Sequence, residues 1–111
     1  HQIGDKVLRS VAGTVRNAIR VSDQIFRYGG EEFVVVLNRI EPKIATQLAE
    51  KICRQVEKDY FVDGDKELKV TISIGGAIIT KEDTDSSLFE RADQAMYQAK
   101  NNGRNQVVMD I

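Results

Sequence analysis

This sequence of 111 residues has only one cysteine, no long apolar run and no excess of positive charge, and each of these features excludes a class of protein. The single cysteine, Cys53, cannot form a disulfide within the chain, which is typical of a reducing compartment such as the cytoplasm. Its place near the apolar stripe of a helix indicates a small core residue. No apolar run reaches the roughly 18 residues that a membrane-spanning helix needs. Because 16 Lys and Arg stand against 17 Asp and Glu, the net charge of −1 argues against a strongly basic nucleic-acid-binding protein.

The remaining composition is that of a folded domain. Hydrophobic residues make up 41% of the chain and charged residues 30%, which is typical of globular proteins. A chain of this length predicts one domain, and no secretory signal pattern opens it. Because the first residue is His1 rather than Met, we expect the chain to be a piece of a longer protein, whose membrane attachment stays open.

Apolar spacing predicts three helices and at least four strands. Apolar positions three or four residues apart predict helices, and strict alternation predicts a strand with one buried face. The runs on either side of Gly29-Gly30 predict a hairpin, and the second run is apolar enough to be covered on both faces. Asp85 or Ser86 is expected to cap the third helix. Helices are expected over residues 5–20, 42–56 and 85–102, and strands over 24–28, 31–37, 68–74 and 106–109, with a small hairpin around Asp63-Gly64.

This order of elements predicts an α+β fold, a ferredoxin-like βαββαβ sheet flanked by helices, with its first, central strand absent from this chain. Without that strand, backbone N–H and C=O groups in the middle of the sheet would lack partners, at about 1–3 kcal/mol for each buried group. We therefore expect a strand before His1 in the natural protein. A complete sheet built from residues 1–111 alone would contradict this argument.

The turn at Gly29–Glu32 has two interpretations. Glycines let the backbone approach a phosphate or ribose closely, and a neighbouring carboxylate can hold Mg²⁺, which prefers oxygen ligands. Glu31 and Glu32 would then play different roles, since successive strand residues point to opposite faces. The other interpretation is a hairpin turn with acidic neighbours.

Charged residues elsewhere are equally open to a structural interpretation. Lys100 and Arg104, on either side of the end of the third helix, either converge on a phosphate or stabilise the helix C-terminus. Asp5 near a helix start is usually a cap. Arg20 and Asp23 at a helix exit usually form a surface ion pair of little energetic worth.

Five motifs occur together along the chain. They are GDKVLR at 4–9, RVSD at 20–23, RYGGEEF at 27–33, VTISIG at 70–75 and ADQAMYQAKNNGRN at 92–105. In this combination and order the sequence resembles a GGDEF domain, the catalytic domain of diguanylate cyclases. The resemblance implies the cyclase-palm form of the ferredoxin-like sheet, and it makes residues 1–111 a partial GGDEF domain that lacks the N-terminal strand and helix.

The resemblance implies a nucleotidyltransferase that condenses two GTP molecules into cyclic di-GMP with release of two pyrophosphates. Each domain of a homodimer would present one GTP, and the 3′-hydroxyl of each nucleotide would attack the α-phosphate of the other. Mg²⁺ or Mn²⁺ is the implied cofactor, activating the hydroxyl and neutralising phosphate charge. An N-terminal sensory or regulatory domain is an implied partner, and no nucleic acid is implied.

Site residues carry over by position. Glu31 resembles the metal-binding acid of the signature, with Glu in the third place where the family name has Asp. Glu32 matches the next acid, which the family needs for catalysis. The resemblance also implies four roles in substrate binding: Gly29 and Gly30 against ribose and phosphate, Asp5 on the guanine edge, Leu8 lining the guanine pocket, and the pair Lys100 and Arg104 on the β- and γ-phosphates.

Arg20 and Asp23 fit the RxxD inhibitory site of the family, which binds the product cyclic di-GMP away from the catalytic turn. An arginine offers a planar fork to phosphate or a guanine edge, and an aspartate accepts from guanine N–H groups. Lys51, on the second helix, is the candidate for an assisting basic residue. Bound product would hold two domains in a non-productive arrangement.

The sequence departs from the family at its N-terminus. The family segment that precedes the position of His1 carries a second metal-binding Asp and an Asn that reads guanine, and neither is in this sequence. The chain as written is therefore expected to be inactive, or an incomplete record of an active domain. Two alternatives stay open: an inactive GGDEF-like domain that senses cyclic di-GMP through Arg20 and Asp23, and a plain ferredoxin-like interaction domain.

Overall fold

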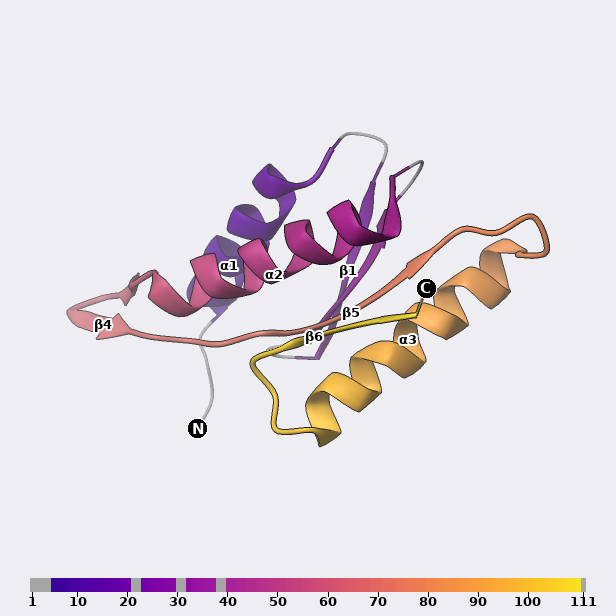
Figure 1. Ribbon diagram of the computed structural model, residues 1–111. Helices are drawn as coiled ribbons and strands as arrows, with labels where there is room; N and C mark the ends of the chain where they lie inside the picture. Colours follow the sequence, from indigo (N-terminus) through magenta and orange to yellow (C-terminus); the bar gives the residue numbers. More distant parts are fainter. Residues whose placement is uncertain (1–4, 21–22, 30–31, 38–39, 111) are drawn as a thin grey trace.

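The computed structural model describes residues 5–20, 23–29, 32–37 and 40–110 of the chain (Figure 1). The α+β class expected from the sequence is confirmed. No helix in this described part combines the length and apolar character that a membrane crossing requires. In chain order the elements are α1 (Asp5–Ala18), β1 (Gln24–Gly29), β2 (Glu32–Leu37), α2 (Pro42–Lys58), β3 (Phe61–Asp63), β4 (Lys66–Leu68), β5 (Ser73–Ile78), α3 (Asp85–Asn101) and β6 (Val107–Asp110).

A four-stranded sheet forms the middle layer of the molecule. Its strand order is β1-β2-β5-β6, and β3 pairs with β4 in a separate small hairpin. The β1–β2 pair is antiparallel, as a hairpin must be, whereas β2–β5 and β5–β6 are parallel. Figure 1 shows α1 and α2 on one face of the sheet and α3 on the other, so the central strands are covered on both sides.

The expected gap in the middle of the sheet is not present among the described residues. β2 pairs directly with β5 in a parallel register that runs from Glu32 opposite Ser73 to Leu37 opposite Ile78. The prediction of unpaired backbone groups at this position is therefore wrong for this structure, because two parallel strands that meet can pair with each other. The expectation of a strand before His1 itself stays a prediction.

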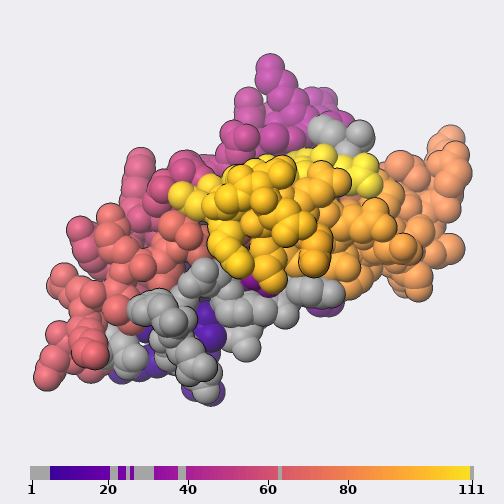
Figure 2. All heavy atoms as spheres, turned by 90° about the horizontal axis from the view of Figure 1, so that it is seen from below, coloured from indigo at the N-terminus to yellow at the C-terminus, as the bar shows by residue number. Residues whose placement is uncertain are grey.

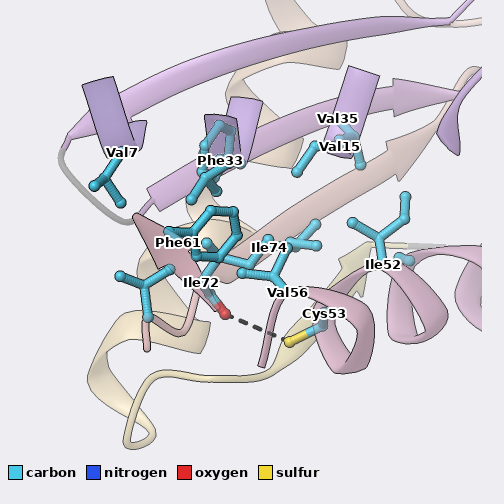
Figure 3. Close-up of a cluster of buried hydrophobic side chains, with 13 residues drawn as sticks. Val7, Val15, Phe33, Val35, Ile52, Cys53, Val56, Phe61, Ile72 and Ile74 are labelled. Atoms are coloured by element: carbon cyan, nitrogen blue, oxygen red, sulfur yellow. Dashed lines mark hydrogen bonds between the residues drawn. The ribbon is translucent and has the colours of Figure 1, made fainter. Parts of the chain in front are cut away.

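Two hydrophobic cores use opposite faces of β2, as its apolar sequence predicts. Phe33 and Val35 are buried in the larger core, against α1 and α2 (Figure 3), and Val34 is buried against α3. Cys53 lies in the larger core, as expected, and its thiol donates to the carbonyl of Ile72 at 3.4 Å. Burial raises the pKa of this thiol, which keeps it protonated and suits a packing role.

The backbone of α3 lies very close to β5. A Cβ atom at Gly75 would overlap the backbone of Ala92 and Met96 on this helix. Figure 2 views the molecule from below and shows that α3 covers the middle of the face seen there. Small residues on the facing side of α3, Ala92 among them, permit this approach. The position of α3 against the sheet therefore depends on the missing side chain at Gly75.

The segment over residues 68–74, expected as one strand, is paired only at its two ends, although its apolar side chains are buried as expected. Leu68 ends the small hairpin, and the sheet strand begins only at Ser73. Val70 and Ile72 are nevertheless buried in the larger core. Alternation along a sequence reports one buried side of an extended chain, and it does not report whether the backbone is paired.

The N-cap of α3 is Thr84, and not Asp85 or Ser86 as expected. The Thr84 hydroxyl accepts from the backbone N–H of Ser87 at 3.1 Å, and the Ser87 hydroxyl accepts from the N–H of Thr84 at 2.9 Å. This reciprocal capping box satisfies two otherwise unpaired donors. Asp85 becomes the first helical residue, where its charge favours the helix dipole.

An ion pair holds the connection between β5 and α3. The Asp83 carboxylate accepts from Nη2 of Arg91 at 2.6 Å, from the backbone N–H of Thr80 at 2.9 Å and from the hydroxyl of Ser87 at 2.8 Å. Nη2 of Arg91 also donates to the carbonyl of Ile78 at 2.6 Å. Because the Asp83 side chain is only 6% exposed, this arrangement depends on its negative charge.

We expect Asp83→Asn to weaken the acid sensitivity of the fold. The hydrogen bond from Arg91, followed by those from Thr80 and Ser87, holds the pKa of Asp83 well below its usual range. The stability contributed by the ionised carboxylate is thus full above about pH 5 and is lost as the pH falls below about 4. Urea unfolding at about pH 7 and about pH 3 measures this loss, which should be smaller in Asp83→Asn than in the unmodified protein.

The matched control is Glu82→Gln, an exposed acid next to Asp83. It should lose as much stability between the two pH values as the unmodified protein does. Equal losses in all three proteins would contradict the role given to Asp83.

Candidate functional site

The fold brings the end of α3 to the edge of the sheet where β2 and β5 begin. Glu32 and Ser73, the first residues of these two strands, pair with each other. Because α3 follows β5 and packs back along it, the end of this helix returns to the edge from which β5 started. The end of β1 at Gly29 reaches the same edge, since β1 and β2 are antiparallel and Gly29 pairs with Glu32. Residues far apart in the sequence thus meet at one place.

Three of the predicted site residues form a charged cluster there. Oε2 of Glu32 lies 3.1 Å from Nη1 of Arg104 and 3.5 Å from Nζ of Lys100. The Glu32 side chain is 12% exposed, whereas Lys100 and Arg104 are 35% and 50% exposed. Exposed ion pairs stabilise a fold by only about 0–1 kcal/mol. Lys100 and Arg104 thus lie together and remain partly exposed, and their binding of phosphate stays a prediction.

An unusual turn carries Arg104. Gly103, Arg104 and Asn105 have φ angles of 114°, 63° and 49°, so three successive residues adopt positive φ. The backbone N–H of Arg104 donates to the carbonyl of Ala99 at 3.0 Å, which ties the turn to the end of α3. A left-handed conformation costs a residue such as arginine about 1–3 kcal/mol, whereas asparagine adopts it more readily.

Contacts from α2 hold Asn105, and sequence reasoning missed them. Nδ2 of Asn105 donates to Oε2 of Glu57 at 2.6 Å, and Nη2 of Arg54 donates to the Asn105 carbonyl at 2.7 Å. Nη1 of Arg54 in turn donates to Oε1 of Glu57 at 2.7 Å. The spacing of Arg54 and Glu57 on one helix indicates that they can pair, but no local pattern indicates a partner in a turn near the end of the chain.

The structure places the other predicted substrate-binding residues only in part. Gly29 ends β1, beside an irregularity in the register of the hairpin, and Leu8 is buried in α1 with 8% exposure. The backbone of Asp5 begins α1, but its side chain is outside what the structure describes. Gly30 and Glu31 also lie outside the described residues, so the metal-binding role expected for Glu31 stays a prediction.

Within the part of the chain that the structure describes, no group of three or more His, Cys, Asp or Glu side chains could hold a metal ion. The Glu32 carboxylate faces two cations, an environment that favours an anion over a second positive charge. Glu32 by itself is therefore poorly placed to hold a divalent cation.

Arg20 and Asp23 form a preorganised pair at the other end of β1. Nε and Nη2 of Arg20 donate to Oδ2 and Oδ1 of Asp23 at 3.0 and 2.9 Å, a bidentate fork. The expectation of an ordinary surface pair is wrong in one respect, because the Asp23 side chain is fully buried while that of Arg20 is 45% exposed. β1 has 6 residues, so the pair lies about 20 Å along the strand from the turn that leads to Glu32.

Lys51, the expected assistant of this pair, lies exposed on α2. Its part in binding any ligand is not tested by the structure and stays a prediction.

Comparison with known proteins identifies relatives of the whole chain. The family model described as "Diguanylate cyclase, GGDEF domain" matches residues 1–106. Diguanylate cyclase A of Treponema denticola is 41% identical over 110 residues, which are 98% of this chain and 30% of that protein. Response regulator PleD of Caulobacter vibrioides is 44% identical over 111 residues, which are 97% of this chain and 24% of that protein. The chain therefore spans less than a third of either relative.

A solved structure agrees with these relatives. The crystal structure of the GGDEF domain of DgcB from Caulobacter crescentus in complex with c-di-GMP matches with a TM-score of 0.77 and 29% sequence identity. The match covers 95% of this chain and 63% of that one. Family model, relatives and fold thus agree with the motifs in the sequence, and the chain belongs to the GGDEF family of diguanylate cyclase domains.

Proposed function

We propose that this chain is the larger part of a diguanylate cyclase domain, which condenses two GTP molecules into cyclic di-GMP as a homodimer. The single observation that carries the proposal is the cluster of Glu32, Lys100 and Arg104. It presents two partly exposed cations beside Glu32, an acid of the family signature. The name of one relative, diguanylate cyclase A of Treponema denticola, supports the same reaction.

The two cations act on the leaving group. Lys100 and Arg104 bind the β- and γ-phosphates of GTP, and they stabilise the negative charge that develops on pyrophosphate as it leaves. Glu32 offsets one of the two positive charges before the nucleotide arrives and keeps both cations oriented, so that little reorganisation is needed on binding. Gly29 and Gly30 allow the turn to approach ribose and phosphate, while Asp5 and Leu8 receive the guanine base.

Glu31 is the residue of this chain proposed to hold Mg²⁺ or Mn²⁺, an ion that would activate the attacking hydroxyl and neutralise phosphate charge. Each protomer of the homodimer presents one GTP, and the domain needs no covalent intermediate. The contribution of the protein is to position two substrates and to stabilise charge.

Product inhibition is assigned to Arg20 and Asp23, with Lys51 assisting. The buried Asp23 holds the exposed guanidinium of Arg20 in one orientation, which lowers the entropic cost of binding a planar or anionic group. The DgcB domain was solved in complex with c-di-GMP, which supports a product-binding site in this family. The pair lies far from the catalytic turn, so bound product acts on the arrangement of two domains and not on GTP directly.

The test is product analysis. The domain, extended by the N-terminal strand and helix that the family resemblance implies, is incubated with GTP and Mg²⁺, and the nucleotides are separated by chromatography. Cyclic di-GMP and pyrophosphate in a ratio of one to two are expected. A domain that binds cyclic di-GMP but makes none would instead be a sensor, the second candidate, which the preorganised Arg20–Asp23 pair also favours.

Arg20→Ala is expected to weaken product inhibition. The variant loses a charged donor to the product, so the inhibition constant for cyclic di-GMP should rise at least about tenfold while the initial rate without product is kept. Arg16→Ala, an exposed arginine in the last turn of α1, is the matched control. An unchanged inhibition constant in folded Arg20→Ala would show that the RxxD assignment is wrong.

A further inference from the structure

We infer that Asn105, held by Glu57 and Arg54 of α2, is a positioning residue that fixes the direction of Arg104 toward the nucleotide phosphates. This inference rests on the proposed function, which makes Arg104 a phosphate ligand. It assigns a role in the phosphate site to Asn105, which does not contact the substrate, and to α2, which the motifs do not connect with this site.

The first step is the backbone of the turn. Arg104 and Asn105 both have positive φ, at 63° and 49°, although neither is glycine. Local hydrogen bonds hold part of the turn: the N–H of Arg104 donates to the carbonyl of Ala99, and Nε2 of Gln106 donates to the carbonyls of Asn102 and Arg104. Asparagine adopts this conformation more readily than most residues, but none of these local bonds involves the Asn105 side chain, whose position depends on contacts from elsewhere.

The second step is the closed set of contacts on Asn105. Its Nδ2 donates to Glu57 at 2.6 Å, and its Oδ1 and its carbonyl both accept from Nη2 of Arg54, at 3.2 and 2.7 Å. Arg54 and Glu57 are themselves paired at 2.7 Å. The donor and acceptor of the amide and the backbone carbonyl are thus all engaged by one helix. The hydrogen bond from Asn105 also lowers the pKa of Glu57, which keeps its carboxylate charged.

The third step is the support behind these contacts. Arg54 and Glu57 flank the buried residues Cys53 and Val56, which pack α2 into the larger core. Asn105 is therefore attached to a rigid element, whereas the neighbouring Arg104 side chain is half exposed and has one ion-pair partner among the described residues, Glu32. Because the two residues are adjacent, holding Asn105 in place also holds the backbone of Arg104, and with it the direction of its side chain. Functional groups supported in this way hold their geometry better than groups on unsupported loops.

The test compares nucleotides that differ in the phosphates Arg104 is proposed to bind. Calorimetric titration of the purified protein with GTP and with GMP, both with Mg²⁺, is carried out for the unmodified chain and for Asn105→Ala, Asn105→Gly and Glu57→Gln. All three variants should lose roughly tenfold in affinity for GTP and keep their affinity for GMP. Asn105→Gly is the critical variant, since glycine adopts positive φ freely but lacks the amide.

Gln55→Ala is the matched control. Gln55 donates to Asp59 at 2.9 Å on the same helix and has no hydrogen bond to the turn, so GTP affinity should be unchanged. Circular dichroism verifies that each variant is folded. Normal GTP binding by Asn105→Gly would overturn the inference. It would show that the positive φ angle at residue 105 is enough to position Arg104 without the hydrogen bonds of the Asn105 amide. An equal loss for GTP and GMP would overturn it as well.

A second measurement separates this inference from the proposed function. The ¹⁵N NMR signal of the Arg104 Nε–H reports the order of this side chain without any nucleotide. In Asn105→Gly the signal should shift and lose order, and an unchanged signal would overturn the inference whatever GTP does. If the unmodified chain and Arg104→Ala bind GTP equally, the phosphate role of Arg104 fails, and the NMR comparison still decides whether Asn105 positions it.

Discussion

Glu31→Gln is expected to abolish the synthesis of cyclic di-GMP while leaving the domain folded. The amide has the size of the carboxylate but lacks its charge, so it is a poor ligand for a divalent cation. The rate should fall by at least about a hundredfold, since metal activation of the attacking hydroxyl and stabilisation of phosphate charge are lost together. Chromatography of the products from GTP measures this rate in the domain extended by its family N-terminal strand and helix.

Two controls make this result specific. Glu90→Gln changes an exposed acid of α3 and should keep full activity. Electron paramagnetic resonance of Mn²⁺ should show weaker metal binding in Glu31→Gln than in Glu90→Gln. A fully active Glu31→Gln variant would refute the metal role of the signature acid, and with it the catalytic interpretation of the turn.

Gly75→Ala is expected to destabilise the domain by more than about 3 kcal/mol, a large share of the ~5–15 kcal/mol that stabilises a typical domain. The added methyl group would overlap the backbone of Ala92 and Met96, and backbone atoms cannot move aside as a side chain can. The helix α3, which carries Lys100, would have to move off the sheet. Thermal unfolding followed by circular dichroism measures the effect as a large drop in Tm.

Two further glycines serve as matched controls. A Cβ at Gly76 would meet only the flexible side chain of Met109 closely, so Gly76→Ala should cost less. Nothing lies within 4 Å of a Cβ at Gly13, in α1, where alanine should stabilise the helix by about 0.5–1 kcal/mol. Similar Tm values for Gly75→Ala and Gly76→Ala would contradict the close approach of α3.

Local features of the fold were predictable because they depend on near neighbours in the chain. The stripe of Val7, Val11 and Val15 predicts α1, and its burial against the sheet follows from the same spacing. The apolar run of β2 predicts a strand covered on both faces, and Gly103 predicts the end of α3. The motifs likewise identified the family without any knowledge of the fold.

Pairing between distant segments was not predictable in the same way. The sequence pattern left a place for a strand between β2 and β5, yet these strands pair directly, because alternation reports burial and not the neighbouring strand. The N-cap of α3 is Thr84, whereas the sequence predicted Asp85 or Ser86. Several neighbouring residues can cap a helix, and the backbone geometry selects one of them.

The amino-acid sequence by itself thus determined the helices, the hairpin, the family and the residue types of the site, all of which follow from local spacing and motif order. Only the tertiary structure decided that Glu32 meets Arg104 across 72 positions of the chain, and that Asn105 rests on Glu57 across 48. The physical reason is that the residues near a side chain in the sequence do not determine which distant residue it will contact. That partner is selected when the two cores close on the sheet and bring the ends of α2 and α3 to its edge.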